Sequence, residues 1–311
     1  MKFKLRHIIA SILLTASFVA PAAAGPFEDA TAAYSKADYA TALRLLRPLA
    51  DQGMAKAQTL LGVMYARGQG VAQNYAEATK WYQLAADQGD ATAQTALGAM
   101  YANGLGVSRD QGKAMQWFRK AADQGNANAQ TVLGTMYDRG EGVQQDYAEA
   151  MKWYRRAAEQ GYANAQNNLA IMYNNGHGVP QDYAEGLKWA RLAAEQGFAT
   201  AQYLLASAYA NGQGVPQNFT EAAKWARLAA DQGLAIAQYY LGLAYGNGQG
   251  VSQDFVQSYM WFELSLGHGY KDAAQGRDTA AKQMSDTQIE EAQKLARDWK
   301  PAMKPPGLLL Q

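Results

Sequence analysis

The chain is predicted to be an all-α, right-handed solenoid of antiparallel helix hairpins with a 36-residue repeat. Six of the seven tryptophans stand 36 residues apart, and they are Trp81, Trp117, Trp153, Trp189, Trp225 and Trp261. Glycines follow the same frame, because twenty-three of the thirty occupy only four of its slots. A fixed period of this length indicates stacked supersecondary units, and it excludes a single core of irregular topology. The chain has no cysteine, so disulfides, thiolate nucleophiles and thiolate metal sites are all excluded.

The first 24 residues have the features of an export signal. Three basic residues precede an uncharged, largely apolar run over 8–20, and Ala22-Ala23-Ala24 offers the small residues that signal peptidase reads. The run is shorter than the about 20 residues that a membrane span needs, so we expect cleavage after Ala24 and no stable membrane insertion afterwards. The mature chain would carry 25 basic and 27 acidic residues. That balance gives no electrostatic footprint for nucleic acid.

Each repeat begins with an amphipathic helix, as residues 54–67 illustrate. Ala57, Leu61, Met64 and Tyr65 share one helical face. Gly62 interrupts this helix, where glycine costs about 1 kcal/mol relative to alanine. The same slot holds only Gly or Ala in the other copies, so we expect a second helix to cross there with its backbone close.

A Gly-x-Gly-Val turn follows the first helix in all six copies. Its first glycine suits the left-handed position that ends a helix. Glycine-rich turns can also cradle phosphate, but no strand precedes these turns and no Lys-Ser or Lys-Thr follows them, which excludes the nucleotide interpretation.

The second helix of each repeat starts at an Asn or Asp that can cap it. Four of the six copies carry Glu three residues later, which predicts a capping box and not a catalytic pair of acids, because capping explains the repetition. The helix carries the periodic tryptophan with Ala four residues on, which assigns the tryptophans to the core between repeats. A glycine then ends each helix.

These signals divide the chain into an N-terminal cap over 25–53, six repeats over 54–269, C-terminal capping helices over 270–300 and a flexible tail over 301–311. The predicted repeats are 54–89, 90–125, 126–161, 162–197, 198–233 and 234–269. In the caps, we expect a short helix over 27–36, a second helix from Asp38, a closing helix over 270–284 and a last polar helix opened by a capping box at Ser285.

The repeat pattern Ala-x-Ala-Gln-x-x-Leu-Gly-x-Met-Tyr-x-x-Gly-x-Gly-Val, followed by Asp-Tyr and Trp-Tyr, resembles the Sel1-like repeat, a relative of the tetratricopeptide repeat. The resemblance covers about 27–270 and weakens over 162–233, where Ala170 and Ala206 replace glycine. It implies a scaffold that holds protein partners, often in the bacterial envelope, and so favours bacterial over eukaryotic export. We expect a periplasmic or secreted protein.

By analogy with tetratricopeptide arrays, a polar stripe on the first helices is expected to line a concave groove that binds a protein or peptide. The candidate partner-binding residues are Arg67, Asn103, Asp138, Arg139, Asn167, Asn175, Tyr203, Asn211, Tyr239 and Asn247. Asparagine can bond an extended peptide or a sugar, and tyrosine offers an amphipathic contact. Two purely structural explanations remain open beside this one. Asparagine before glycine also helps to end a helix, and the tyrosines would also serve packing between repeats.

No catalytic residue, metal site or cofactor is predicted. After signal removal only His177 and His268 remain, both in solvent-facing loops, and a metal site needs three or four ligands. No serine is followed three residues later by lysine, and Gly-x-Ser-x-Gly is absent. The predicted function is therefore an exported adaptor or regulator without chemistry of its own. A binder of peptidoglycan fragments or other glycans is the first alternative. A hydrolase like the β-lactamases, which the resemblance raises through cysteine-rich relatives, is the second.

Overall fold

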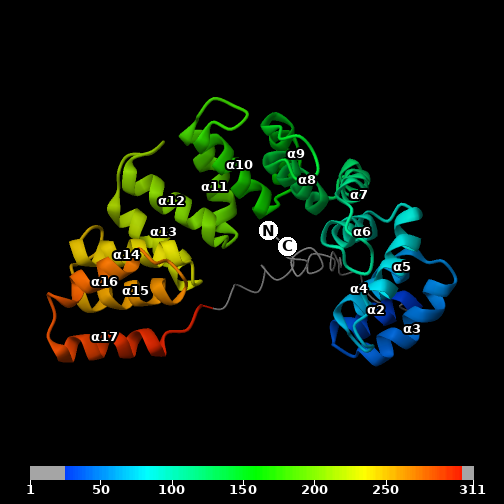
Figure 1. Cartoon of the computed structure of the whole chain (residues 1–311), viewed down its shortest axis with the longest axis horizontal. Helices are drawn as coiled ribbons and strands as arrows, with labels where there is room; N and C mark the ends of the chain where they lie inside the picture. Colours follow the sequence, from blue (N-terminus) through cyan, green and yellow to red (C-terminus); the bar gives the residue numbers. More distant parts are fainter. Residues whose placement is uncertain (1–24, 303–311) are drawn as a thin grey trace. The chain divides into compact units, whose positions relative to one another are not determined.

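The computed structural model describes residues 25–302, so the predicted signal segment and the last nine residues of the tail lie outside the described residues. The described chain forms two units that meet between Gln160 and Gly161. Each unit is a stack of antiparallel helix hairpins (Figure 1). The prediction of an all-α solenoid is thereby confirmed.

The first unit contains α2 (Pro26–Ser35), α3 (Tyr39–Asp51), α4 (Ala55–Arg67), α5 (Tyr75–Asp87), α6 (Ala91–Asn103), α7 (Gln111–Asp123), α8 (Ala127–Arg139) and α9 (Tyr147–Glu159). The second unit contains α10 (Ala163–Asn175), α11 (Tyr183–Glu195), α12 (Ala199–Asn211), α13 (Phe219–Asp231), α14 (Ala235–Asn247), α15 (Phe255–Gly267), α16 (Ala273–Ala281) and α17 (Asp286–Asp298). The closing helix α16 is shorter than the predicted span of 270–284, because a turn at 282–285 ends it before the capping box of α17.

Backbone hydrogen bonds set the shape of each hairpin. In the first repeat, Gly68 ends α4 in the left-handed conformation, with φ 68°, and its N–H donates to the carbonyl of Met64. The Asn74 N–H then donates to the Tyr65 carbonyl at 2.9 Å, which folds the turn back onto the helix. The second glycine of the turn has a further role. A Cβ on Gly106 would collide with the backbone of Tyr75, so this slot allows close approach to the preceding hairpin.

The predicted capping boxes form only in part. The Asn74 side chain accepts the Glu77 N–H at 3.1 Å, as a cap should. The Glu77 carboxylate, however, bonds Lys80 on the next turn and does not reach back to the cap. A lysine three residues on competes for the carboxylate in the same way in α9, α11 and α13. The complete box predicted at Ser285 is present, with Gln288 as its partner.

An aromatic ring, and not a helix backbone, occupies the space at the helical glycines. A Cβ on Gly62 would lie 2.5 Å from the Tyr82 ring, and one on Gly98 would lie 2.9 Å from the Phe118 ring. Gly134 faces Tyr154, and Gly242 faces Phe262 in the same way. Where the first helix carries Ala170 or Ala206, the second carries Ala190 or Ala226 in place of the ring. The expectation of a backbone crossing was wrong, because the ring fills the gap that glycine leaves.

A relay of glutamine side chains links each hairpin to the next. Gln94 is 4% exposed, and its amide donates to the Ala86 carbonyl at the end of the preceding hairpin. Its oxygen accepts from Gln124 at 2.7 Å. The last repeat replaces that second glutamine with His268, whose Nδ1 lies 2.8 Å from the Gln238 oxygen. Because the Gln238 amide already donates to Ala230, Nδ1 must carry the proton, and His268 therefore serves packing within the stack.

The tryptophans form a seam between hairpins. Trp81, Trp153 and Trp261 are at most 9% exposed, whereas the other three periodic tryptophans are half-buried. An arginine from the preceding hairpin covers each buried ring, as when the Arg119 guanidinium carbon lies 5.6 Å from the centre of Trp153. The assignment of the tryptophans to the core is complete for three of the six rings and partial for the rest.

Candidate interaction surface

All ten predicted contact residues lie on the first helices of their hairpins, in α4, α6, α8, α10, α12 and α14. Four of them, from Arg67 to Arg139, belong to the first unit, and the other six belong to the second.

Several of these side chains interact within the chain. The Asn103 amide donates to the Ala99 carbonyl at 2.9 Å, and the Asn211 amide donates to the Ser207 hydroxyl at 3.3 Å. These bonds stabilise the ends of their own helices. Arg139 forms an ion pair with Glu141 at 3.6 Å. Asn103, Asn211 and Arg139 thus have local partners.

Neighbouring groups or burial also restrain three further side chains, those of Arg67, Asp138 and Asn167. Burial raises the pKa of Tyr34, and the neighbouring Arg67 guanidinium opposes that rise, so Arg67 contacts the N-terminal hairpin. Asp138 is half-buried. Asn167 is only 5% exposed, and its Oδ1 has no hydrogen-bond partner within residues 25–302. Asn167 therefore lies in the packed interior of α10, whereas Asn175 at the end of the same helix is exposed.

Tyrosines gather on the second unit. The Tyr239 ring lies 4.9 Å from Tyr270 and 5.6 Å from Phe262, measured between ring centres. Burial raises the pKa of Tyr203, and the nearby Tyr270 and Tyr239 hydroxyls raise it further. Tyr203 and Tyr239 are half-buried, so part of each ring packs within the chain and part faces solvent.

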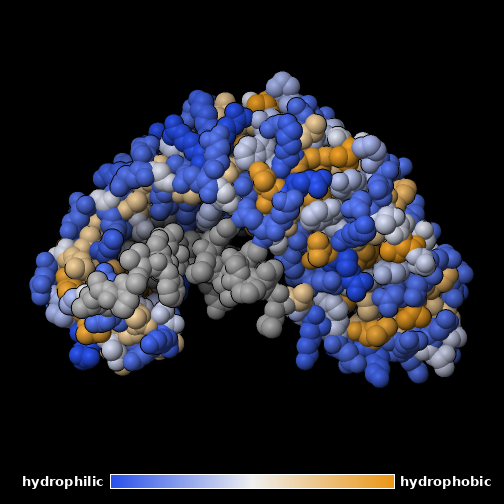
Figure 2. Space-filling view, turned by 180° about the vertical axis from the view of Figure 1, so that it is seen from behind, coloured by the Kyte–Doolittle hydropathy of each residue, from blue (hydrophilic) through white to orange (hydrophobic). Residues whose placement is uncertain are grey.

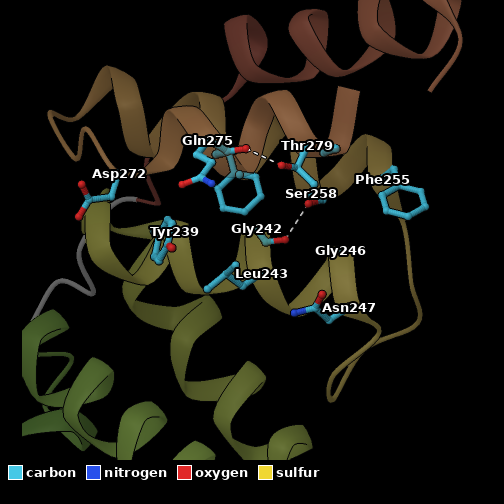
Figure 3. Close-up of a pocket in the computed structure, with 13 residues that line it drawn as sticks. Tyr239, Gly242, Leu243, Gly246, Asn247, Phe255, Ser258, Asp272, Gln275 and Thr279 are labelled. Carbon is cyan, nitrogen blue, oxygen red and sulfur yellow. Dashed lines mark hydrogen bonds between the residues drawn. The ribbon is translucent and has the colours of Figure 1, made fainter. Parts of the chain in front are cut away.

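A cavity of about 260 Å³ opens beside these tyrosines, between α14, α15 and α16 (Figure 3). Its apolar lining comes from five side chains, Tyr239, Leu243, Phe255, Phe262 and Ala280. Its polar lining comes from five others, Asn247, Ser258, Asp272, Gln275 and Thr279. Two predicted contact residues, Tyr239 and Asn247, thus belong to one cavity.

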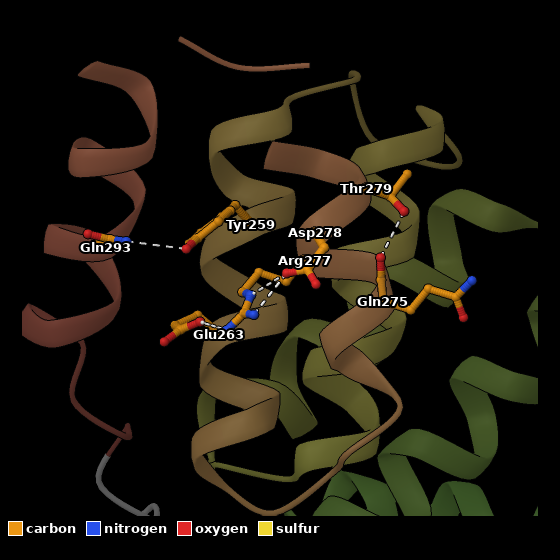
Figure 4. Close-up of polar contacts among 7 residues, drawn as sticks. All are labelled: Tyr259, Glu263, Gln275, Arg277, Asp278, Thr279 and Gln293. Carbon is orange, nitrogen blue, oxygen red and sulfur yellow. Dashed lines mark hydrogen bonds and ion pairs between the residues drawn. The ribbon is translucent and has the colours of Figure 1, made fainter. Parts of the chain in front are cut away.

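Two internal bonds hold the polar wall of this cavity in place. The Ser258 hydroxyl donates to the Gly242 carbonyl at 2.7 Å, and the Thr279 hydroxyl donates to the Gln275 carbonyl at 2.8 Å. On the far side of α16, Arg277 joins Glu263 of α15 at 3.2 Å (Figure 4). The Gln293 amide of α17 donates to the Tyr259 hydroxyl of α15 at 3.3 Å. The Arg277–Glu263 contact therefore ties α16 to α15, and the Gln293–Tyr259 contact ties α17 to α15.

This cavity was not predicted from the sequence, although two glycines in unusual positions point to it. The slot of Gly246 holds a side chain in the other five copies, from Ala66 to Ala210. Gly276 is a further helical glycine, in α16. A Cβ at Gly246 would meet Ser258, and one at Gly276 would collide with the Phe262 ring, so neither position adds a side chain to the cavity wall.

Exposed apolar side chains are more frequent on the second unit. Orange patches interrupt the blue surface of that unit, which lies on the right in Figure 2. Leu192, Leu228, Leu243 and Leu295 are each at least 37% exposed there. Leu243 is the one among them that lines the cavity.

Residues 25–302 contain neither a cluster of metal ligands nor a helix that could cross a membrane. Within 25–302, no group of three or more His, Asp or Glu side chains is placed to hold a metal ion. Over the same residues, every helix is too short or too polar to cross a membrane.

The Sel1 repeat model matches the chain seven times, at 32–54, 55–90, 91–126, 127–162, 163–198, 199–234 and 235–270. The chain belongs to the Sel1 repeat family. Its first match falls in the segment of α2 and α3, which the sequence analysis assigned to a cap. The matches end at 270, so α16, which completes the cavity, and α17 lie outside them.

Solved structures of Sel1 repeat proteins are similar to this chain. A Sel1 repeat protein from Oxalobacter formigenes is 34% identical, with a TM-score of 0.71, over 77% of this chain and 96% of that one. A protective antigen of uropathogenic Escherichia coli strains is 27% identical, with a TM-score of 0.49, over 88% of this chain and 84% of that one. No curated protein matches the chain.

Proposed function

We propose that this Sel1 repeat protein is exported to the periplasm and there holds a protein partner, as an adaptor or regulator of an envelope process and without catalysing a reaction. The repeat solenoid is a scaffold suited to protein–protein interaction. The observation that carries the proposal for this chain is the cavity at α14–α16, where polar groups without hydrogen-bond partners lie beside a half-buried tyrosine and an exposed leucine. Tyrosine is enriched at protein interfaces because it has a large apolar body and a polar tip.

The export step has a direct test. A chain with a C-terminal tag is produced in a Gram-negative host, the periplasmic fraction is separated, and the N-terminus of the tagged product is sequenced. We expect a product that begins at Gly25 in the periplasm. A product that keeps Met1 or stays in the cytoplasm contradicts this part of the proposal.

Partner binding is tested by placing a photocrosslinking amino acid at exposed positions. Leu243 and Asn247 are the test positions, because both are exposed and line the cavity. Lys188 and Lys224 are matched controls, because both are exposed on second helices and lie away from the cavity. We expect a discrete crosslinked protein from the test positions alone. Equal crosslinking at all four positions, or none at any, contradicts the proposed binding surface.

The glycan alternative is separated from protein binding by calorimetry. Purified muropeptides are titrated into the chain beside the crosslinking experiment. We expect no saturable heat, because the cavity lining contains no Lys, Arg or His to pair with muropeptide carboxylates. Saturable muropeptide binding that is lost on substitution of Tyr239 and Asn247 would favour the glycan function over the adaptor function.

A further inference from the structure

The cavity at α14–α16 has the Phe262 ring at its floor. The ring lies between Gly242 and Gly276, and a Cβ at either position would collide with it. Gly246 adds no side chain on the α14 wall. Because the ring packs against both glycines and is only 3% exposed, it closes the bottom of the cavity, and the accessible apolar surface comes mainly from Leu243 and Tyr239.

The charge in the lining of the cavity is negative. Asp272 is the single charged residue in the lining, and it is exposed. The basic side chain nearest in the sequence of α16, Arg277, pairs with Glu263 and with Asp278 at 2.8 Å. Asp272 therefore has no ion-pair partner within the described part of the chain, and the electrostatic field it contributes favours a cation.

Three polar side chains around the cavity have hydrogen-bonding groups that no other described residue satisfies. Asn247, Asp272 and the Gln275 amide form no hydrogen bond to any residue between 25 and 302. Two of the three equivalent asparagines in the earlier repeats have a partner, since Asn103 bonds Ala99 and Asn211 bonds Ser207. Asn175, the third, is exposed as Asn247 is. The equivalent of Ser207 is Leu243 in the last repeat, so Asn247 has no local partner.

We propose that this cavity takes a lysine or arginine side chain from an extended segment of the protein partner, with the cationic end at Asp272 and the aliphatic stem on Leu243. The inference rests on the proposed function and names the chemistry of its partner. Asp272 and Tyr239 lie at one end of the cavity and Asn247 at the other, so the Asn247 amide is available to the backbone of the bound segment (Figure 3). The half-buried Tyr239 adds an aromatic ring on which a guanidinium or ammonium group is stabilised.

The size of the cavity agrees with a single side chain. Sites for drug-sized ligands enclose about 300–1,000 Å³, and this one encloses about 260 Å³. An acidic occupant would face the Asp272 carboxylate without a compensating cation. A purely apolar occupant would leave that carboxylate unpaired.

The test uses three acetylated, amidated pentapeptides that differ only at the central residue, which is arginine, norleucine or glutamate. Each is titrated into the purified full chain, and the amide NMR signals of Gly242, Gly246 and Gly276 report on the cavity. Gly53 and Gly89, whose Cβ positions face open space, are the control signals. We expect saturable shifts of the cavity glycines with the arginine peptide, and at least threefold weaker binding of the other two.

Two variants examine the geometry. Asp272→Asn keeps the fold, because the Asp272 side chain makes no capping bond to α16, and we expect it to weaken arginine binding about threefold to tenfold. Thr279→Trp fills the cavity from an exposed position and should weaken binding more than tenfold, whereas Lys282→Trp on the same helix should not. Raised salt should weaken the arginine peptide and leave the norleucine peptide unchanged.

Three results would each overturn the proposal. They are equal binding of the arginine and norleucine peptides, binding that Thr279→Trp leaves intact, and absence of saturable shifts with all three peptides. The proposed function fails separately, when the crosslinking positions capture no protein. Crosslinking at Leu243 without arginine selectivity would reject the basic side chain and keep the adaptor.

Discussion

Replacing Gly98 with alanine tests the way the two helices of a hairpin fit together. Gly98 lies in α6, and a Cβ at this position would lie 2.9 Å from the Cδ1 and Cε1 atoms of Phe118 in α7. Carbon atoms in good contact lie about 3.5–4.0 Å apart, so the ring would have to retreat by about 0.6–1.1 Å. Phe118 is only 1% exposed and belongs to a cluster of buried apolar side chains, so the ring can retreat only by displacing its neighbours.

The magnitude follows from two opposing terms. Overpacking a filled core costs about 1–3 kcal/mol, and alanine gains about 1 kcal/mol over glycine within a helix. We therefore expect Gly98→Ala to lower the free energy of unfolding by up to about 2 kcal/mol. Phe118→Ala alone should cost about 3–5 kcal/mol, but it removes the collision. In that background Gly98→Ala should become stabilising by about 1 kcal/mol.

The assay is a double-mutant cycle measured by urea unfolding and far-ultraviolet circular dichroism. The expected coupling energy equals the overpacking term, about 1–3 kcal/mol. Hydrogen exchange of α6 and α7 shows whether the loss is confined to that hairpin, since repeat proteins can open locally. Gly267→Ala is the control, because a Cβ there meets nothing within 4 Å. If Gly98→Ala has the same effect with and without the Phe118 ring, the complementary fit of glycine and ring is refuted.

Three further variants test other parts of the framework. The Tyr82 hydroxyl is buried without a hydrogen bond in the described structure, so Tyr82→Phe should raise the free energy of unfolding by about 1–3 kcal/mol at pH 7. Burial also raises the pKa of Tyr82 far above its ordinary value of 10.0, so the folded state loses stability as the pH rises above 10. Tyr82→Phe should lessen that loss when the free energy of unfolding is measured from pH 8 to 11. Hydrogen bonds from Thr41 lower the pKa of Asp38 below 3.8, so the stability that this cap contributes is complete above that pH and declines below it. Asp38→Asn should keep the cap and make the melting temperature less dependent on pH below pH 4. A melting temperature that still falls with pH as it does in the wild type would contradict the assignment of this pH dependence to Asp38. Gln94→Met should cost about 1–3 kcal/mol in urea unfolding, because it removes the two hydrogen bonds that the buried Gln94 side chain forms with the Ala86 carbonyl and the Gln124 amide, whereas Gln116→Met on an exposed face of α7 should be neutral.

The repeat frame was legible in the sequence because its signals are local. A helix end at Gly68, a cap at Asn74 and an apolar face along α4 each depend on residues within a few positions of one another. The pairing of glycine or alanine in the first helix with a ring or alanine in the second was also present in the sequence. It was missed because helical propensity suggested a backbone contact at Gly62, whereas packing places the Tyr82 ring there.

The roles of the polar residues depended on their neighbours. Asn103, Asn211 and Asn247 occupy one slot of the frame, yet the first two bond within their own helices and the third does not. His268 looked like an isolated loop residue, and it completes the glutamine relay through Gln238. In each case the residue 4 or 30 positions away decided the outcome, and the slot alone did not.

The sequence by itself determined the helices, their ends and the repeating hairpin, since these follow from hydrogen bonds and faces that recur every 36 residues. The cavity at α14–α16 was decided by the tertiary structure. It exists because α16, which follows the last repeat, approaches α14 across the Phe262 ring at positions where Gly242, Gly246 and Gly276 provide no side chains. Such a gap depends on the distance between helices that are not consecutive in the chain, and no periodic pattern specifies that distance.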